Sequence, residues 1–106
     1  MAKVTVKIIS GDLSDLPQRK AVYAIFAQSK DSSEPINCRY VGETDNLEER
    51  TESHFRDNEK NECLKDFMQS TKTKSMIYEL MPNSDKNDRL NKEKEWIKIH
   101  NPTCNK

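Results

Sequence analysis

Two polar side chains share a predicted helix face with an apolar residue in CRYVGETDNLEERTESHF, residues 38–55. At about 100° per residue, Arg50 falls about 60° and His54 about 20° from Leu47. A guanidinium on an inward face must be paired or must line a cleft, because an unpaired buried charge is costly. Two interpretations follow: a packed histidine beside an arginine whose head group reaches solvent, or the polar wall of a site.

The predicted C-terminal helix carries a carboxylate on its apolar face. Glu93 falls in the middle of the inward arc to which Trp96 and Ile97 belong, whereas Glu95 falls on the opposite, solvated side. Burying a lone carboxylate costs several kcal/mol unless it is paired or binds a cation. Glu93 is therefore either a salt-bridge partner of Arg50 with no further purpose, or a metal ligand beside a cationic clamp.

Two tyrosines, Tyr23 and Tyr40, lie one on each strand of a predicted hairpin and can add phenols to the same cleft. A set of Tyr, Arg, His and Glu suits phosphodiester hydrolysis. A carboxylate can hold Mg²⁺, which stabilises charge on phosphate and activates water. Arginine supplies donors to the non-bridging oxygens, and a phenol or imidazole can transfer a proton.

The elements that must position these groups follow from apolar periodicity and turn residues. The pattern predicts strands over 4–9, 21–28, 36–42 and 75–82, and helices from Thr44 or Asp45 to about Arg56, over 61–70, and from Ser84 or Asp85 to His100. The second strand is apolar enough to be central, and the second and third form an antiparallel hairpin. The order indicates an α+β fold with a small, mostly antiparallel sheet flanked by helices.

Length and composition indicate one domain over residues 1–106 with a thin core. Eighteen basic and eighteen acidic residues give a net charge of zero, so overall charge does not support nucleic-acid binding. The start has no apolar run suited to a signal peptide or membrane span, which predicts a cytoplasmic protein. Cys38, Cys63 and Cys104 are odd in number and widely spaced, which favours reduced thiols over a disulfide or zinc site.

The same residues resemble the signatures of the GIY-YIG nuclease superfamily. AVY and YVG match its two triplets, with Tyr23, Tyr40 and Gly42 in the matching places, although AVY departs from the nominal first triplet. Arg50 follows the glycine by eight residues, and His54 comes one helical turn later. The closing segment EKEWIKIHNPTCN resembles the family's last motif, which gives Glu93 as the acid and Asn105 as the terminal asparagine.

The resemblance covers about residues 20–105 and implies a fold and an activity. It implies a three-stranded antiparallel sheet flanked by helices, with residues 1–19 as an extra N-terminal strand or arm. It also implies DNA cleavage with one divalent cation, Mg²⁺ or Mn²⁺, held by Glu93. Tyr23 would be the general base or the phenol that positions water, and Tyr40 would support the network. Arg50 and His54 would act around the phosphate, while Gly42 and Asn105 would order the site.

The sequence departs from a typical nuclease in its charge near the site. Five acidic residues lie between Glu43 and Glu52, with Arg50 as the basic residue among them, although phosphate neutralisation usually supplies most non-specific DNA affinity. We therefore expect weak DNA binding unless a partner domain or second subunit adds positive charge. Candidate DNA contacts in this chain are Arg39, Lys72, Lys74, Lys94 and Lys98.

Three hypotheses remain. The first is a metal-dependent DNA endonuclease of the repair or mobile-element type, because no helix-turn-helix, zinc finger or basic arm is recognisable. The second is a catalytically silent module of the same fold that binds nucleic acid or a protein. The third is a structural domain whose inward charges form one ion-pair network. Stabilisation by Mg²⁺ would separate the first from the third.

Overall fold

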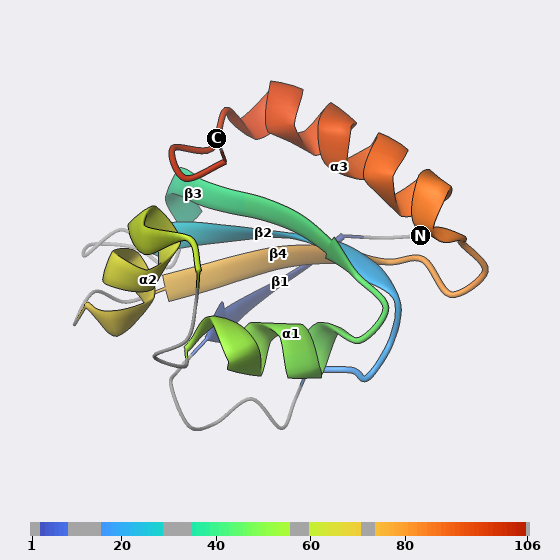
Figure 1. Ribbon diagram of the computed structural model, residues 1–106, viewed down its shortest axis with the longest axis horizontal. Helices are drawn as coiled ribbons and strands as arrows, with labels where there is room; N and C mark the ends of the chain where they lie inside the picture. Colours follow the sequence, from blue (N-terminus) through green and yellow to red (C-terminus); the bar gives the residue numbers. More distant parts are fainter. Residues whose placement is uncertain (1–2, 9–15, 29–34, 56–59, 71–73, 106) are drawn as a thin grey trace.

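The computed structural model of the protein describes residues 3–8, 16–28, 35–55, 60–70 and 74–105. The elements, in chain order, are β1 (Lys3–Ile8), β2 (Ala21–Gln28), β3 (Pro35–Thr44), α1 (Leu47–His54), α2 (Glu62–Gln69), β4 (Lys74–Leu80) and α3 (Lys86–His100). The predicted α+β class and the predicted order of elements are confirmed (Figure 1).

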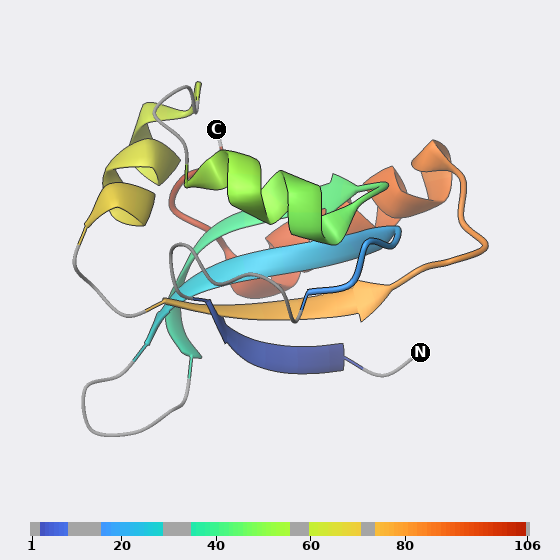
Figure 2. The same ribbon diagram turned by 90° about the horizontal axis from the view of Figure 1, so that it is seen from below.

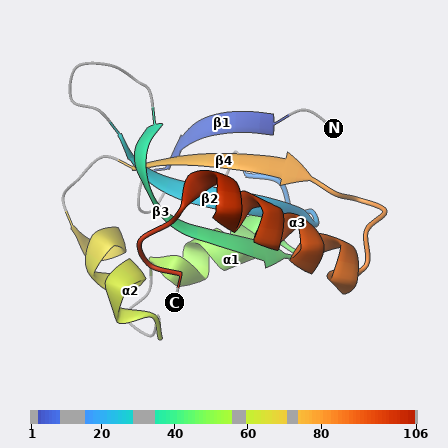
Figure 3. The ribbon, with the colours of Figure 1, turned by 90° about the horizontal axis from the view of Figure 1, so that it is seen from above.

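The strands form one antiparallel sheet in the order β1-β4-β2-β3 (Figure 3). As predicted, β2 is an inner strand that pairs with β3 on one side and β4 on the other. The N-terminal strand β1 pairs with β4, so it extends the sheet at one edge. The other edge is β3, which carries Tyr40 and Gly42. The site predicted from sequence therefore lies beside an edge strand.

The helices cover both faces of the sheet. In Figure 1, α3 lies on one side of the sheet and α1 on the other; Figure 2 shows α1 in front of the strands. The core on the α1 and α2 side includes Tyr23, Ile25, Leu47, Leu64, Phe67 and Met76. The core on the α3 side includes Val22, Phe26, Cys38, Val41 and Trp96. Alternation along β2 sends odd-numbered side chains to α1 and even-numbered ones to α3.

A β-bulge in the hairpin decides which face Tyr40 occupies. Ile25 pairs with Tyr40, but the next residue, Phe26, pairs with Cys38, so Arg39 is the additional residue in β3. Without it, Cys38 and Tyr40 would share a face, because side chains alternate along a strand. With it, Cys38 packs on the α3 side and Tyr40 packs on the α1 side with Tyr23.

Side-chain caps fix where the helices begin. Asn46 caps α1, in place of the predicted Thr44 or Asp45, because its side chain accepts the Glu49 N–H. Asn61 caps α2, and Asp85 opens α3 in a capping box with Asp88. No helix among the described residues is long and apolar enough to cross a membrane.

The prediction of three reduced cysteines was wrong. Cys63 of α2 and Cys104 of the C-terminal segment form a disulfide across 41 positions. An odd cysteine count and wide spacing say nothing about which residues the fold brings together, and that is why sequence reasoning missed the bond. Cys38 is the free cysteine, and burial raises the pKa of its thiol to about 12, with a weaker opposing effect from a main-chain hydrogen bond with Tyr40.

Candidate active site

Two predicted site residues meet in the core beneath α1. The Tyr23 hydroxyl lies 2.7 Å from His54 Nε2, and both side chains are fully buried. The half-buried Tyr40 completes an aromatic group, with ring centroids 6.2 Å from Tyr23 and 5.3 Å from His54. This arrangement follows from the sequence periodicity, because Leu47, Thr51 and His54 form the buried face of α1. A phenol so close to an imidazole nitrogen can exchange a proton with it.

Gly42 provides the space in which this group packs. A Cβ added there would lie 2.5 Å from the Tyr23 hydroxyl oxygen and 2.9 Å from a Tyr40 ring carbon. Cross-strand pairing explains the contact, because Gly42 lies directly opposite Tyr23 in the β2–β3 register. The glycine is therefore required by close approach, since any side chain at this position would displace the phenols.

Arg50 lies at the surface of the same group, and unlike the fully buried Leu47 it is not part of the core. Its side chain is exposed overall, and its head group reaches back to the tyrosines. Burial alone would lower the pKa of Arg50, but the Tyr23 and then the Tyr40 phenol attract and hydrogen-bond the guanidinium, so the pKa is raised. Arg50 thus presents a permanent positive charge to solvent directly above two phenol oxygens.

The C-terminal segment binds the outer edge of β3. Asn105 Oδ1 accepts from the Val41 N–H, and Asn105 Nδ2 donates to the Val41 carbonyl, each at 2.7 Å. The main-chain N–H groups of Thr103 and Cys104 donate to the carbonyls of Cys38 and Arg39. Asn105 therefore holds the strand between Tyr40 and Gly42 through both of its amide groups.

Glu93 approaches the same edge from the α3 side. It is half-buried, and its carboxylate accepts a hydrogen bond from the Glu43 main-chain N–H. Burial raises the pKa of Glu93, and the Glu43 carboxylate raises it further, while that N–H and Lys86 act in the opposite direction. The proposed salt bridge between Glu93 and Arg50 is absent from the ion pairs of the described residues. Glu95 is exposed, as predicted.

The ion pair beside Glu93 is formed by residues that sequence reasoning missed. Arg89 Nε donates to Glu43 Oε2 at 3.0 Å, and both side chains are largely buried. Arg89 also donates to the carbonyl and hydroxyl oxygens of Ser84. A signal was available, because Arg89 precedes Glu93 by four residues and so shares its helix face.

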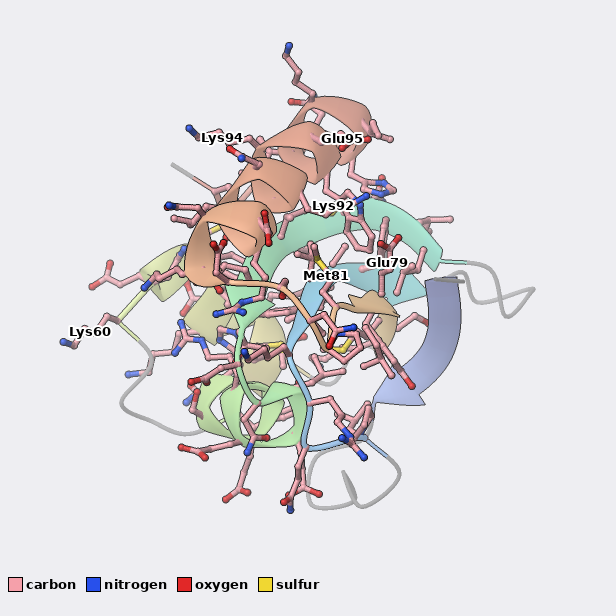
Figure 4. All side chains as sticks on the ribbon, turned by 90° about the vertical axis from the view of Figure 1, so that its right-hand side faces the viewer. Lys60, Glu79, Met81, Lys92, Lys94 and Glu95 are labelled. Atoms are coloured by element: carbon pink, nitrogen blue, oxygen red, sulfur yellow. A yellow bond between two sulfur atoms is a disulfide. The ribbon has the colours of Figure 1, made fainter. Side chains whose placement is uncertain are left out.

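The predicted DNA contacts differ in their environments. Arg39 is half-buried with its guanidinium 5.2 Å from the centre of the Phe67 ring, and Lys94 and Lys98 are exposed on α3 (Figure 4 labels Lys94). The prediction that Lys74 contacts DNA must be corrected. Its side chain is buried and donates to the Ser70 carbonyl at 3.0 Å, and burial lowers the pKa of its ammonium group. Its ammonium group is thus poorly available to phosphate. Lys72 lies outside the described residues.

The side chains around Glu93 offer a small donor set for the expected divalent cation. The described residues contain no group of three or more His, Cys, Asp or Glu side chains that could hold a metal ion. Mg²⁺ does not require one, since it commonly binds one or two carboxylates and keeps several waters. Glu93 fits that mode, because a half-buried carboxylate whose pKa is raised by burial and by a second carboxylate gains from a nearby cation.

Comparison with known families agrees with the resemblance in the sequence. The family model for the GIY-YIG catalytic domain matches residues 19–106. No curated protein matches the chain significantly.

Proposed function

The chain belongs to the GIY-YIG nuclease superfamily, and we propose that it is a divalent-metal-dependent endonuclease that hydrolyses DNA phosphodiester bonds. One observation carries the proposal: two unlike sets of groups meet around one edge strand. On one face of β3, Tyr23, Tyr40 and Arg50 offer phenols and a cation. On its outer edge, Glu93 offers a carboxylate that accepts from the strand itself.

In this proposal, Glu93 holds one Mg²⁺ or Mn²⁺ ion. Once bound, the ion would neutralise charge that develops on the phosphate. The half-buried position of Glu93 fixes the carboxylate on the rigid α3–β3 contact, which is better suited to orientation than an exposed loop. The exposed Glu95, two residues further on, serves as a natural comparison because it has the same chemistry and is solvated.

On the face of β3 that carries Tyr23 and Tyr40, Arg50 is the first group that DNA would meet. Its side chain is exposed, and its guanidinium already hydrogen-bonds two oxygens, those of Tyr23 and Tyr40. Non-bridging phosphate oxygens are stronger acceptors than phenols because they carry charge. We therefore expect phosphate to draw the guanidinium outward, which stabilises the substrate and gives access to the fully buried Tyr23 hydroxyl.

Tyr23 and His54 then act as a pair. Tyr23 accepts a proton from the attacking water as it passes its own proton to His54 Nε2, which lies 2.7 Å away. Because His54 is fully buried behind Tyr23, it works through the phenol rather than on the phosphate. Tyr40 supports the pair by packing its ring against both.

The test is cleavage of supercoiled plasmid and of branched or flapped DNA in Mg²⁺, Mn²⁺ or EDTA. We expect nicking that requires the cation, is lost in Glu93→Gln and is kept in Glu95→Gln. Preference for branched DNA would assign the enzyme to repair-type or mobile-element-type substrates. Equal cleavage by wild type and Glu93→Gln would remove Glu93 from the metal site, and no cleavage by the folded wild type would contradict the endonuclease proposal.

A second candidate is a silent module of the same fold that binds DNA or a protein. The observation in its favour is the acidic first turn of α1, where Glu48 and Glu49 directly precede Arg50 in the chain and would repel phosphate. This module would show DNA retention without cleavage, or neither in the absence of a partner. Addition of the cognate partner domain or second subunit would then be needed for DNA affinity.

A further inference from the structure

The contact between α3 and β3 contains a buried arginine that the proposed reaction does not use. Arg89 is 6% exposed, and its guanidinium makes three hydrogen bonds: one to Glu43 and two to Ser84. Both its partners are fixed points of the site, because Glu43 directly follows Gly42 and Ser84 immediately precedes the α3 cap. A buried guanidinium held by three hydrogen bonds is a rigid connection rather than a surface charge.

This connection lies directly beside Glu93. Arg89 and Glu93 are four residues apart on α3 and so lie one above the other. Glu93 in turn accepts from the Glu43 N–H. The side chain of Glu43 is thus held toward Arg89 while its main chain is held toward Glu93. A polar cavity of about 230 Å³, lined by Glu43, Thr44, Asp45, Lys86 and Arg89, opens next to this pair.

We propose that Arg89 is a positioning residue that holds the Glu43 carboxylate away from the cation at Glu93, so that the ion is held by one carboxylate. The inference rests on the proposed function. In the wild type, Arg89 neutralises the charge of the Glu43 carboxylate, with 3.0 Å between Arg89 Nε and Glu43 Oε2. Without it, Glu43 is a second carboxylate beside Glu93. Two carboxylates bind a divalent cation more tightly than one, because affinity rises with ligand charge, and an ion so held has fewer positions left for phosphate.

The substitution Arg89→Met should therefore change metal binding and cleavage in opposite directions. Titration of the DNA-free protein with Mn²⁺, followed by electron paramagnetic resonance, should show affinity raised about tenfold. Cleavage of plasmid under saturating Mn²⁺ should fall about tenfold. Glu43→Gln should weaken Mn²⁺ binding, because Arg89 loses its anion and turns to Glu93. The double variant should bind Mn²⁺ about as wild type does.

The outcomes separate this inference from the proposed function. If wild type binds Mn²⁺ but Arg89→Met binds it equally or more weakly, Arg89 only stabilises the fold or Lys86 takes over Glu43, and the inference is overturned. If wild type binds no Mn²⁺ and cleaves no DNA, the proposed function fails and the inference with it. Thermal unfolding of each variant checks that all four proteins are folded during the titration.

Discussion

The two sides of strand β3 differ in the kind of polar group that they present. Toward α1 are two phenols, an imidazole and an arginine, and the aromatic rings pack within 6.2 Å of one another. Toward α3 are two carboxylates, Glu43 and Glu93, with Arg89 bound to one of them. The first side suits an anion and proton transfer; the second suits a cation.

The sheet itself keeps these groups apart in so small a protein. The sheet is an apolar layer between them, and strand alternation sends neighbouring side chains of β3 to opposite sides. Gly42 has no side chain, so the phenols of Tyr23 and Tyr40 approach β3 closely at this residue. A ligand that bridges both sides must bind over the edge of β3 near Gly42.

Breaking the disulfide should have the largest effect, because it ties α2 to the C-terminal segment that binds the edge of β3. Replacing Cys63 and Cys104 with serine releases the C-terminal segment from α2, and a closed loop of this length is worth about 4 kcal/mol of unfolding free energy. Urea unfolding with and without dithiothreitol measures this for the wild type. An unchanged midpoint after reduction would show that the hydrogen bonds of residues 103–105 suffice.

Arg50→Ala should impair the function of the α1 side of β3 and leave the α3 side intact. We expect cleavage to fall about 10²-fold, because a donor to the developing phosphate charge is lost. The unfolding free energy should fall by about 1 kcal/mol, because the side chain is exposed but its guanidinium hydrogen-bonds two phenols. Cleavage rates and urea midpoints measure the two quantities, with Arg50→Lys as the charge-preserving control. A loss of stability as large as the loss of activity would assign Arg50 a structural role.

Gly42→Ala should disturb the α1 side of β3 more than the α3 side. The added methyl group forces Tyr23 and Tyr40 to move, and we expect cleavage to fall at least about tenfold. Mn²⁺ affinity should be nearly unchanged, because Glu93 lies on the α3 side of the strand. Parallel loss of Mn²⁺ affinity would mean that the two sides are not independent.

Much of this arrangement could be predicted from sequence, and the reasons are local. Helical periodicity placed His54 in the core and Glu95 in solvent, and both are found there. Apolar character identified β2 as an inner strand. These features depend on spacing along one element, which a sequence states directly.

The features that were missed depend on contacts between distant segments. The bulge at Arg39, the disulfide and the Arg89–Glu43 pair each require a register or a docking that spacing does not contain. The exposure of Arg50 could not be read from spacing either: the helix projection gives the direction of its Cβ, whereas the long side chain is exposed along its length and hydrogen-bonds the tyrosines with its guanidinium.

The smallest expected effect is on the pH dependence of stability, through Glu93 on the α3 side of β3. Burial and the Glu43 charge raise the folded-state pKa of Glu93 above the ordinary value of 4.5, so the folded protein loses stability as pH rises from 4.5 through the raised pKa. The variant Glu93→Gln does not lose stability in this way, because glutamine does not titrate. It should be more stable than wild type at neutral pH by less than about 1 kcal/mol, since solvent screens the half-exposed group.

Below the ordinary pKa of Glu93, the difference between the two proteins should vanish, because wild-type Glu93 is then protonated in both states. Thermal unfolding across the pH range measures this, and Glu95→Gln serves as the exposed control. A difference that grows toward acid would show that Glu93 is stabilised as a charge in the metal-free protein.

The hydrogen bonds along the outer side of β3 have a consequence for association between molecules. An edge strand with unbonded main-chain groups is a template for another strand and therefore for aggregation. Here Asn105 saturates Val41, and Glu93 accepts from Glu43, so these two side chains also keep a second chain from pairing with this edge. A variant without both side chains would leave the main-chain groups of Val41 and Glu43 open to another strand, while the main-chain hydrogen bonds from Thr103 and Cys104 to the same edge would remain.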